Sequence, residues 1–222
     1  MKRQYLGDSK DSFKWDYHDY LMSELKYRYF NVALMLTPDD TTNEGKTKPE
    51  SFKAKASILR FCNDLQEGCK VIEKIQKLPR YTGADYQVNF HKDEVIFTNK
   101  ERMGYFAGFN ADFDQIVLLD PDNGFEPEKS CRYKHVSYTD VARILEQVTQ
   151  NSVVTVFQHF RRKSFPTDYE RIKQRLGGYP STAIYWNSLM FVAISRSESV
   201  INKVKLINKK YRDSNSSNIH PL

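Results

Sequence analysis

The sequence predicts an α/β fold, with a mostly parallel, Rossmann-like sheet and helices on both faces of that sheet. Three observations predict it. Apolar runs of strand length alternate along the chain with segments of helical periodicity. The runs are nearly continuous in Val, Ile and Leu, as in parallel strands covered on both faces. Two further runs flank Asn187-Ser188 near the C-terminus, which predicts an antiparallel hairpin at the end of the domain.

The first half of the chain supplies helices and two buried strands. Phe13, Tyr17 and Leu21 share one face of a predicted helix over residues 11–26. The apolar run NVALMLT, residues 31–37, is the first predicted strand. Later elements are one long helix over 52–78, short strands at 86–90 and 94–97, a short helix within 99–109, and the strand QIVLL at 115–119.

Capping signals mark the helices of the second half. Ser137-x-x-Asp140 predicts a helix start before an apolar face that reaches residue 148, and Thr167-x-x-Glu170 predicts a second start. Between them, SVVTVF at residues 152–157 is the third buried strand. The elements fit one domain over residues 1–212, with 52–110 as a candidate helical insertion or cap and 213–222 as a flexible tail.

The composition indicates a soluble protein. Of the 222 residues, 40% are hydrophobic and 28% are charged. No apolar stretch approaches the roughly 20 residues of a membrane span, and the N-terminus lacks an apolar signal core, so we expect no membrane association and a cytoplasmic location. Cys62, Cys69 and Cys131 fit no zinc pattern. The net charge of +6 permits a polyanionic partner.

Polar residues follow all three buried strands. These endings are Thr37-Pro38-Asp39-Asp40, Asp120-Pro121-Asp122-Asn123-Gly124 and Gln158-His159-Phe160-Arg161-Arg162. Ligands of open α/β sheets bind beyond the carboxyl ends of the strands. The three endings therefore predict a functional cleft at one edge of the sheet, against the alternative of three ordinary polar turns.

Asp120 and Asp122 are the strongest pair of candidates. Residues two apart on a strand share a face, so both carboxylates would meet at one point if the strand continued through Pro121. That geometry suits a divalent metal such as Mg²⁺ or Mn²⁺. The competing interpretation is that Asp122-Asn123-Gly124 is turn chemistry.

His159 and the basic run after it are the next candidates. A histidine at a strand end beside arginines is a candidate proton carrier, although a lone histidine is more often structural. Arg161, Arg162 and Lys163 predict phosphate contacts, with a solvated loop as the alternative.

The first helix carries a second polar cluster. Asp11, Lys14 and His18 have the spacing of one helical face, opposite the apolar stripe. Gly7-Asp8 is the predicted entry turn, and Asp11 is the candidate capping residue. This face is either exposed to solvent, or it lines the cleft with Asp8, Asp11 and Lys14. No glycine-rich phosphate loop occurs in the sequence.

The order of these motifs resembles the bacterial methyltransferases that act on adenine N6 of large-subunit ribosomal RNA. The resemblance rests on GDSKDSFK at residues 7–14, the strand NVALMLT and the later strand ending VLLDPDNG. The sequence is also similar to an uncharacterised bacterial set with GDxxDxxK, LTPD, LDPDNG and QH motifs. In the methyltransferases an Asp-Pro-Pro-Tyr motif holds the target amine and stacks on the base. Here Asp122-Asn123 stands in place of Pro-Tyr, and the first-strand loop is the acidic TPDDTTNEG.

The resemblance implies a cofactor and a set of residues. It implies that S-adenosylmethionine binds near four residues: Thr37, Asp39, Asp11 and Asn123. It also implies a nucleic-acid partner, RNA or DNA. The candidate catalytic residues across the hypotheses are Asp120, Asp122, His159 and Lys14.

Three hypotheses about function stay open. The first is a nucleic-acid methyltransferase that modifies a base amine. The second is a Mg²⁺- or Mn²⁺-dependent nuclease or phosphohydrolase that uses Asp120, Asp122 and His159. The third is a nucleic-acid-binding protein with a decayed catalytic site.

Overall fold

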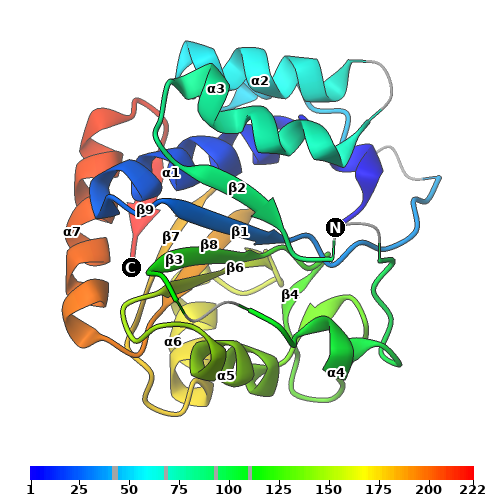
Figure 1. Ribbon diagram of the computed structural model, residues 1–222, viewed down its shortest axis with the longest axis vertical. Helices are drawn as coiled ribbons and strands as arrows, with labels where there is room; N and C mark the ends of the chain where they lie inside the picture. The colour runs from blue at the N-terminus through cyan, green and yellow to red at the C-terminus, as the bar shows by residue number, and fades with distance from the viewer. Residues whose placement is uncertain (42–44, 68–69, 93–94, 110–111) are drawn as a thin grey trace.

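A seven-stranded sheet organises the molecule (Figure 1). The computed structural model describes residues 1–222 except 42–44, 68–69, 93–94 and 110–111. In sheet order the strands are β2 (Gln87–Phe90), β1 (Tyr29–Ala33), β3 (Gln115–Leu119), β6 (Val153–His159), β8 (Leu189–Ile194), β7 (Ser181–Trp186) and β9 (Ile219–Pro221). The first four are parallel, and β8 runs antiparallel to both β6 and β7. The predicted Rossmann-like fold and its C-terminal hairpin are confirmed.

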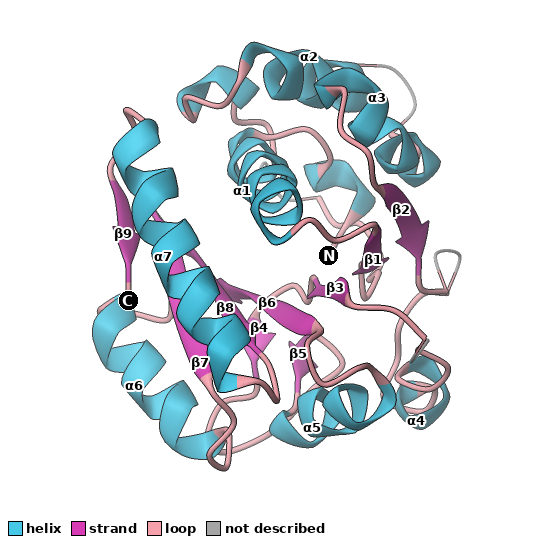
Figure 2. Ribbon diagram, turned by 60° about the vertical axis from the view of Figure 1, so that its left-hand side comes forward, coloured by secondary structure: helices cyan, strands magenta, loops and turns pink. Residues whose placement is uncertain are grey.

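Helices cover both faces of the sheet (Figure 2). One apolar cluster joins the sheet to α1 (Ser9–Leu25), α2 (Ala56–Gln66), α3 (Leu78–Thr82) and α7 (Glu198–Ser214). The other joins it to α4 (Arg102–Tyr105), α5 (Tyr138–Gln147) and α6 (Phe165–Arg175). Short 3-10 turns lie at Arg3–Tyr5, Pro49–Ser51 and Ile72–Lys77, and β4 (Gly124–Phe125) pairs with β5 (His135–Val136) as a separate ribbon.

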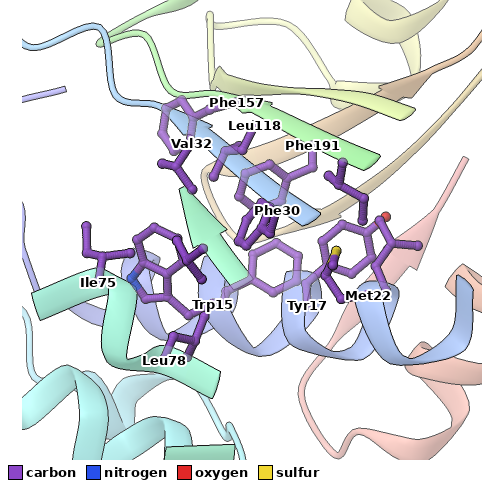
Figure 3. Packing of buried hydrophobic residues seen from close by; sticks show 14 of the residues in the cluster. Trp15, Tyr17, Met22, Phe30, Val32, Ile75, Leu78, Leu118, Phe157 and Phe191 are labelled. Atoms are coloured by element: carbon purple, nitrogen blue, oxygen red, sulfur yellow. The ribbon is translucent and has the colours of Figure 1, made fainter. Parts of the chain in front are cut away.

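Helix α1 is buried between the sheet and the outer helices. Trp15 and Tyr17 are both fully buried, and Figure 3 shows them beneath Phe30 of β1 and Phe191 of β8. Most polar side chains of α1 are buried as well, including His18, although Ser23 is exposed. The helix therefore has no exposed charged face, because its second face packs against α2 and α7 instead of meeting water.

The sheet contains a topological switch point. From β1 the chain continues to β2 on one side, whereas from β3 it continues to β6 on the other side. Between the carboxyl ends of β1 and β3 the connections diverge, and such a point is where ligands of open α/β sheets bind. The N-terminus of the chain lies beside the tip of β1 (Figure 1).

Several predicted boundaries were wrong, including that of the first strand, which was predicted over residues 31–37 but ends at Ala33. The single helix over 52–78 is broken, because α2 ends at Gln66 and the backbone of Glu67 and Val71 is extended before a 3-10 turn. Residues 95–97 form no strand, while residue 94 lies outside the described part. Helix α6 begins earlier than expected, since Ser164 caps it and accepts a hydrogen bond from the Thr167 N–H.

The C-terminal tail is more ordered than predicted. Residues 219–221 form β9, which pairs with β7, and Leu222 exchanges two backbone hydrogen bonds with Ala183. The prediction of a flexible 213–222 tail was therefore wrong for its last residues, because β7 offers an open edge that a polar tail can still pair with through its backbone. Cys69 lies outside the described residues, and Cys62 is buried.

Candidate functional site

A cavity of about 220 Å³ opens beside the N-terminus of α1, at the carboxyl ends of β3 and β6. Residues from five regions of the chain line it. They are Met1, Lys2, Tyr5, Asp8, Lys10, Asp11, Lys14, Gly45, Asp120, Pro121, Asp122, Asn123, Lys134, Phe157 and His159. Two of the three predicted strand endings, those after β3 and β6, therefore meet the first helix at this cavity, whereas Thr37-Pro38-Asp39-Asp40 does not line it.

Lys14 joins two carboxylates at the base of this cavity. Its Nζ lies 2.6 Å from Asp11 Oδ1 and 2.7 Å from Asp120 Oδ2. All three side chains are buried. Burial disfavours the charged form of Lys14, but Asp11 and Asp120 outweigh it and raise the Lys14 pKa. Burial raises the pKa of Asp120, although Lys14 opposes that shift. The result is a fixed cation that neutralises much of the buried negative charge.

Asp8 combines a capping role with a place in the cavity wall. Its Oδ1 accepts hydrogen bonds of 2.9 Å from the backbone N–H groups of Lys10 and Asp11. Gly7 donates its own N–H to Asp11 Oδ2, which fixes the turn into α1. Burial, and then the nearby Asp11 charge, raise the Asp8 pKa to about 6. Asp8 is thus a carboxyl group that exchanges a proton near neutral pH.

Asp122 points to different partners from Asp120. It accepts a 2.6 Å hydrogen bond from Thr37 Oγ1 and lies 2.8 Å from the α-amino group of Met1. Burial raises the Asp122 pKa, but the α-amino group and Thr37 outweigh burial and hold it below its ordinary value. The two carboxylates therefore line one cavity but accept hydrogen bonds from different side chains, Lys14 for Asp120 and Thr37 for Asp122, because Pro121 ends the strand alternation between them.

The α-amino group of Met1 also reaches the strand ends. It donates to the carbonyl oxygens of Met35, at 3.0 Å, and Asp120, at 3.1 Å. These contacts place Met1 between the carboxyl ends of β1 and β3, at the switch point.

His159 and Lys10 face one another at the rim of the cavity. Lys10 Nζ lies 3.1 Å from His159 Nε2. Phe157 precedes His159 by two positions on β6 and contributes an aromatic wall, with its ring centroid 5.8 Å from Lys14 Nζ.

Asn123 lines the cavity beside Asp122, and its Nδ2 lies 3.4 Å from His135 Nε2. Two residues proposed for the cofactor lie apart from each other. Thr37 is buried against Asp122, whereas Asp39 is exposed and accepts a hydrogen bond from the Gln4 N–H outside the cavity.

The predicted phosphate-binding run lies outside the cavity lining. Arg161 donates to Gln158 Oε1 at 2.6 Å and lies 3.4 Å from Asp168 Oδ2, so it braces the connection between β6 and α6. Arg162 is exposed with a left-handed backbone (φ 61°), and Lys163 is exposed.

Metal chemistry has little support in this arrangement. Within the described residues, no group of three or more His, Cys, Asp or Glu side chains is arranged to hold a metal ion. The space between Asp11 and Asp120 is bridged by the Lys14 ammonium group.

Sequence reasoning missed several residues that line the cavity: Met1, Lys2, Tyr5, Lys10, Phe157 and Lys134. One signal was available for Phe157. It lies two positions before His159 on a strand, and such residues share a face. Lys10 lies on α1 four positions before Lys14, so helical spacing was a signal for it as well. No local pattern places the other four at the cavity.

A scan of protein-family models finds no match to this chain, and a search of curated proteins finds no relative. The resemblance to rRNA methyltransferases therefore stays a prediction. No helix in the described part of the chain is both long and apolar enough to cross a membrane.

Proposed function

We propose that this chain is a nucleic-acid-modifying enzyme that seats one base of a polynucleotide in the cavity, with Asp120 facing the exocyclic amine. The observation that carries the proposal is the meeting of buried Asp120 with the Phe157 ring at the carboxyl edge of a Rossmann-like sheet. A carboxylate accepts hydrogen bonds from an amine. An aromatic wall offers the stacking that holds an unstacked base.

Two exposed aromatic residues that adjoin the cavity lining in sequence support a nucleic-acid partner. Tyr133 and Phe160 are large exposed aromatic residues, 38% and 47% exposed. Each adjoins a residue of the cavity lining in sequence, Lys134 and His159 respectively. Exposed aromatic rings beside cationic groups are typical of surfaces that bind single-stranded nucleic acid.

Asp8 supplies the proton chemistry in this proposal. An amine that gains a substituent must lose a proton, and a general base works best when its pKa lies near the working pH. The Asp8 pKa of about 6 meets that condition at the cavity wall. Lys14 holds Asp120 in place through their 2.7 Å contact.

Methyl transfer from S-adenosylmethionine is the reaction that the sequence resemblance implies. The cavity of about 220 Å³ is smaller than the roughly 300–1,000 Å³ of pockets that enclose a whole drug-sized ligand. The acidic loop after β1 is already engaged, since Asp39 accepts from Gln4 and Asp40 pairs with Lys2. The described residues therefore do not fit a methyl donor together with a base, and the donor carries no step of the mechanism.

The first experiment is isothermal titration of the protein with S-adenosylmethionine, S-adenosylhomocysteine, Mn²⁺ and a single-stranded RNA. It is repeated on Asp120→Ala and on Asp85→Ala, an exposed control. We expect RNA binding by all three proteins. Mass spectrometry of the RNA after incubation with each protein should show base modification lost in Asp120→Ala alone. Micromolar cofactor binding without metal supports methyl transfer.

Two other outcomes would support the alternative hypotheses. Mn²⁺ binding that disappears in Asp120→Ala, without cofactor binding, contradicts base modification and supports the nuclease hypothesis. RNA binding without cofactor binding, metal binding or modification supports the decayed binding protein.

A further inference from the structure

A second hollow lies next to the cavity and differs from it in charge. It has a volume of about 970 Å³ and shares Gly45 with the cavity lining. Its lining residues are Arg3, Gln4, Asp39, Asp40, Thr41, Gly45, Lys46, Lys48, Gln66 and Lys70. We call this hollow the basic groove. None of these side chains is a large apolar group, so the groove suits a polar, charged partner.

The acidic residues of the basic groove are already paired. Asp40 forms an ion pair with Lys2 and accepts a 3.0 Å hydrogen bond from Gln4 Nε2. Asp39 accepts a hydrogen bond from the Gln4 N–H. These contacts hold the carboxylates against the N-terminal segment, and so they reduce the negative charge that an incoming ligand meets.

The cations of the groove face solvent. Arg3, Lys46 and Lys48 are exposed, and Lys70 is half-buried where its ammonium donates to the Gln4 carbonyl oxygen. Among the lining residues that the structure describes, four cations stand against two engaged carboxylates, which leaves this set positive. A concave surface of one sign concentrates ligands of the opposite sign.

The groove and the cavity meet through one stretch of chain. Lys2 and Tyr5 line the cavity, whereas Arg3 and Gln4 line the groove. A strand whose base enters the cavity has to place its neighbouring phosphates close to this stretch. Nucleic-acid backbones are bound mainly through Lys and Arg contacts to phosphate.

We propose that the basic groove binds the phosphodiester backbone of single-stranded nucleic acid and leads one of its bases into the cavity. This inference rests on the proposed function, and it assigns the backbone contacts to Arg3, Lys46 and Lys48. The earlier candidate Arg161 is engaged with Gln158 and Asp168 instead.

The test is fluorescence anisotropy with labelled single strands of RNA and of DNA, each about 12 nucleotides long. The full chain is compared with the triple variant Arg3→Gln, Lys46→Gln, Lys48→Gln. A control variant, Lys203→Gln, Lys205→Gln, Lys209→Gln, removes the same charge from exposed positions of α7. Salt is varied between about 50 and 200 mM.

We expect the groove variant to raise Kd about tenfold and to reduce the slope of log K against log salt by about two, since each single-strand phosphate contact contributes about 0.7. The control variant should match the wild type. Comparing RNA with DNA shows which backbone the groove prefers.

Three outcomes would overturn the proposal. They are an equal loss of affinity in both variants, no loss of affinity in the groove variant, and no binding of either strand by the wild type. Groove-dependent binding of phosphatidylserine vesicles without binding of nucleic acid would overturn it as well. Groove-dependent strand binding with no base modification contradicts the proposed function and leaves the groove assignment standing. Base modification that persists at full strength in the groove variant contradicts the groove assignment alone.

Discussion

At the scale of single residues, Lys14 is the centre of the buried charges. It contacts Asp11 on its own helix and Asp120 after β3, 106 positions away in the sequence. Removing one partner from a buried ion pair leaves a charge without compensation, which typically costs about 3–5 kcal/mol. Lys14 therefore links α1 to the carboxyl end of β3, and it also lines the cavity.

Replacing Lys14 tests this role. We expect Lys14→Met to lower the free energy of unfolding by about 3–5 kcal/mol, because two buried carboxylates lose their cation. Urea unfolding at neutral pH measures the loss, with Lys203→Met on the exposed face of α7 as the control. Adding Asp120→Asn should restore part of the stability, and a Lys14→Met protein as stable as the control would contradict the assignment.

The burial of His18 makes the stability of the folded state depend on pH. Its ring bridges the Lys14 carbonyl oxygen, at 2.7 Å, and Thr155 Oγ1, at 2.9 Å. Burial, assisted by the Lys14 charge, lowers the His18 pKa from 6.5 to about 3. The folded state thus keeps His18 neutral at pH values where the unfolded chain protonates it. The stabilisation is complete above pH 6.5 and is lost as the pH falls toward 3.

This dependence predicts a difference between two unfolding series. Between pH 6 and 4, one proton taken up on unfolding lowers the free energy of unfolding by about 1.4 kcal/mol per pH unit. His18→Gln should remove that contribution, so its free energy of unfolding should fall less steeply with decreasing pH. Chemical denaturation at several pH values measures both slopes. Parallel slopes would show that His18 does not titrate in this way.

At the scale of elements, the start of α1 depends on a close approach to α2. Gly7 has a left-handed backbone (φ 80°), and a Cβ there would overlap the Cys62 carbonyl oxygen and the Gln66 backbone nitrogen. Gly83 has a similar φ of 72°, but a Cβ at that position meets nothing within 4 Å. The two glycines therefore share a backbone conformation and differ only in their surroundings.

This pair separates backbone strain from steric overlap. Gly83→Ala should cost about 1–2 kcal/mol, the usual penalty of a left-handed conformation. Gly7→Ala should cost several kcal/mol more, because backbone atoms of α2 must also move. Thermal and urea unfolding of both variants measure the difference. Equal losses would mean that the α1–α2 approach adapts without cost.

Element prediction succeeded where the pattern is local. Strand β3 coincides with the run QIVLL, and Ser137 and Asp140 form the predicted capping box. Element prediction failed where contacts between residues far apart in the sequence determine the local structure. The 52–78 pattern keeps helical periodicity across a break, and the polar tail pairs with β7 only because that edge is open in the fold.

At the scale of the whole molecule, the sequence predicted the place of the candidate site better than its internal geometry. Parallel strands end at one edge of a sheet, so the meeting of Asp120 and His159 follows from topology. Which group pairs with which carboxylate does not follow, because Lys14 and Thr37 reach Asp120 and Asp122 through tertiary packing. The periodicity of apolar residues along one strand does not indicate which side chains of a helix pack against that strand.

The burial of α1 has a consequence for how the chain folds. The Tyr17 hydroxyl donates to Asn208, 191 positions later in the sequence, and Tyr211 donates to Asp16 across 195 positions. Contacts between residues so far apart in the sequence form slowly, because the chain loses the entropy of closing a long loop before the contact stabilises it. During synthesis, α1 remains without α7, one of its neighbours, until that helix has emerged. The enclosure of α1 is thus completed late, and until then an aromatic residue such as Tyr17, which packs against Tyr211 of α7, is available to chaperones.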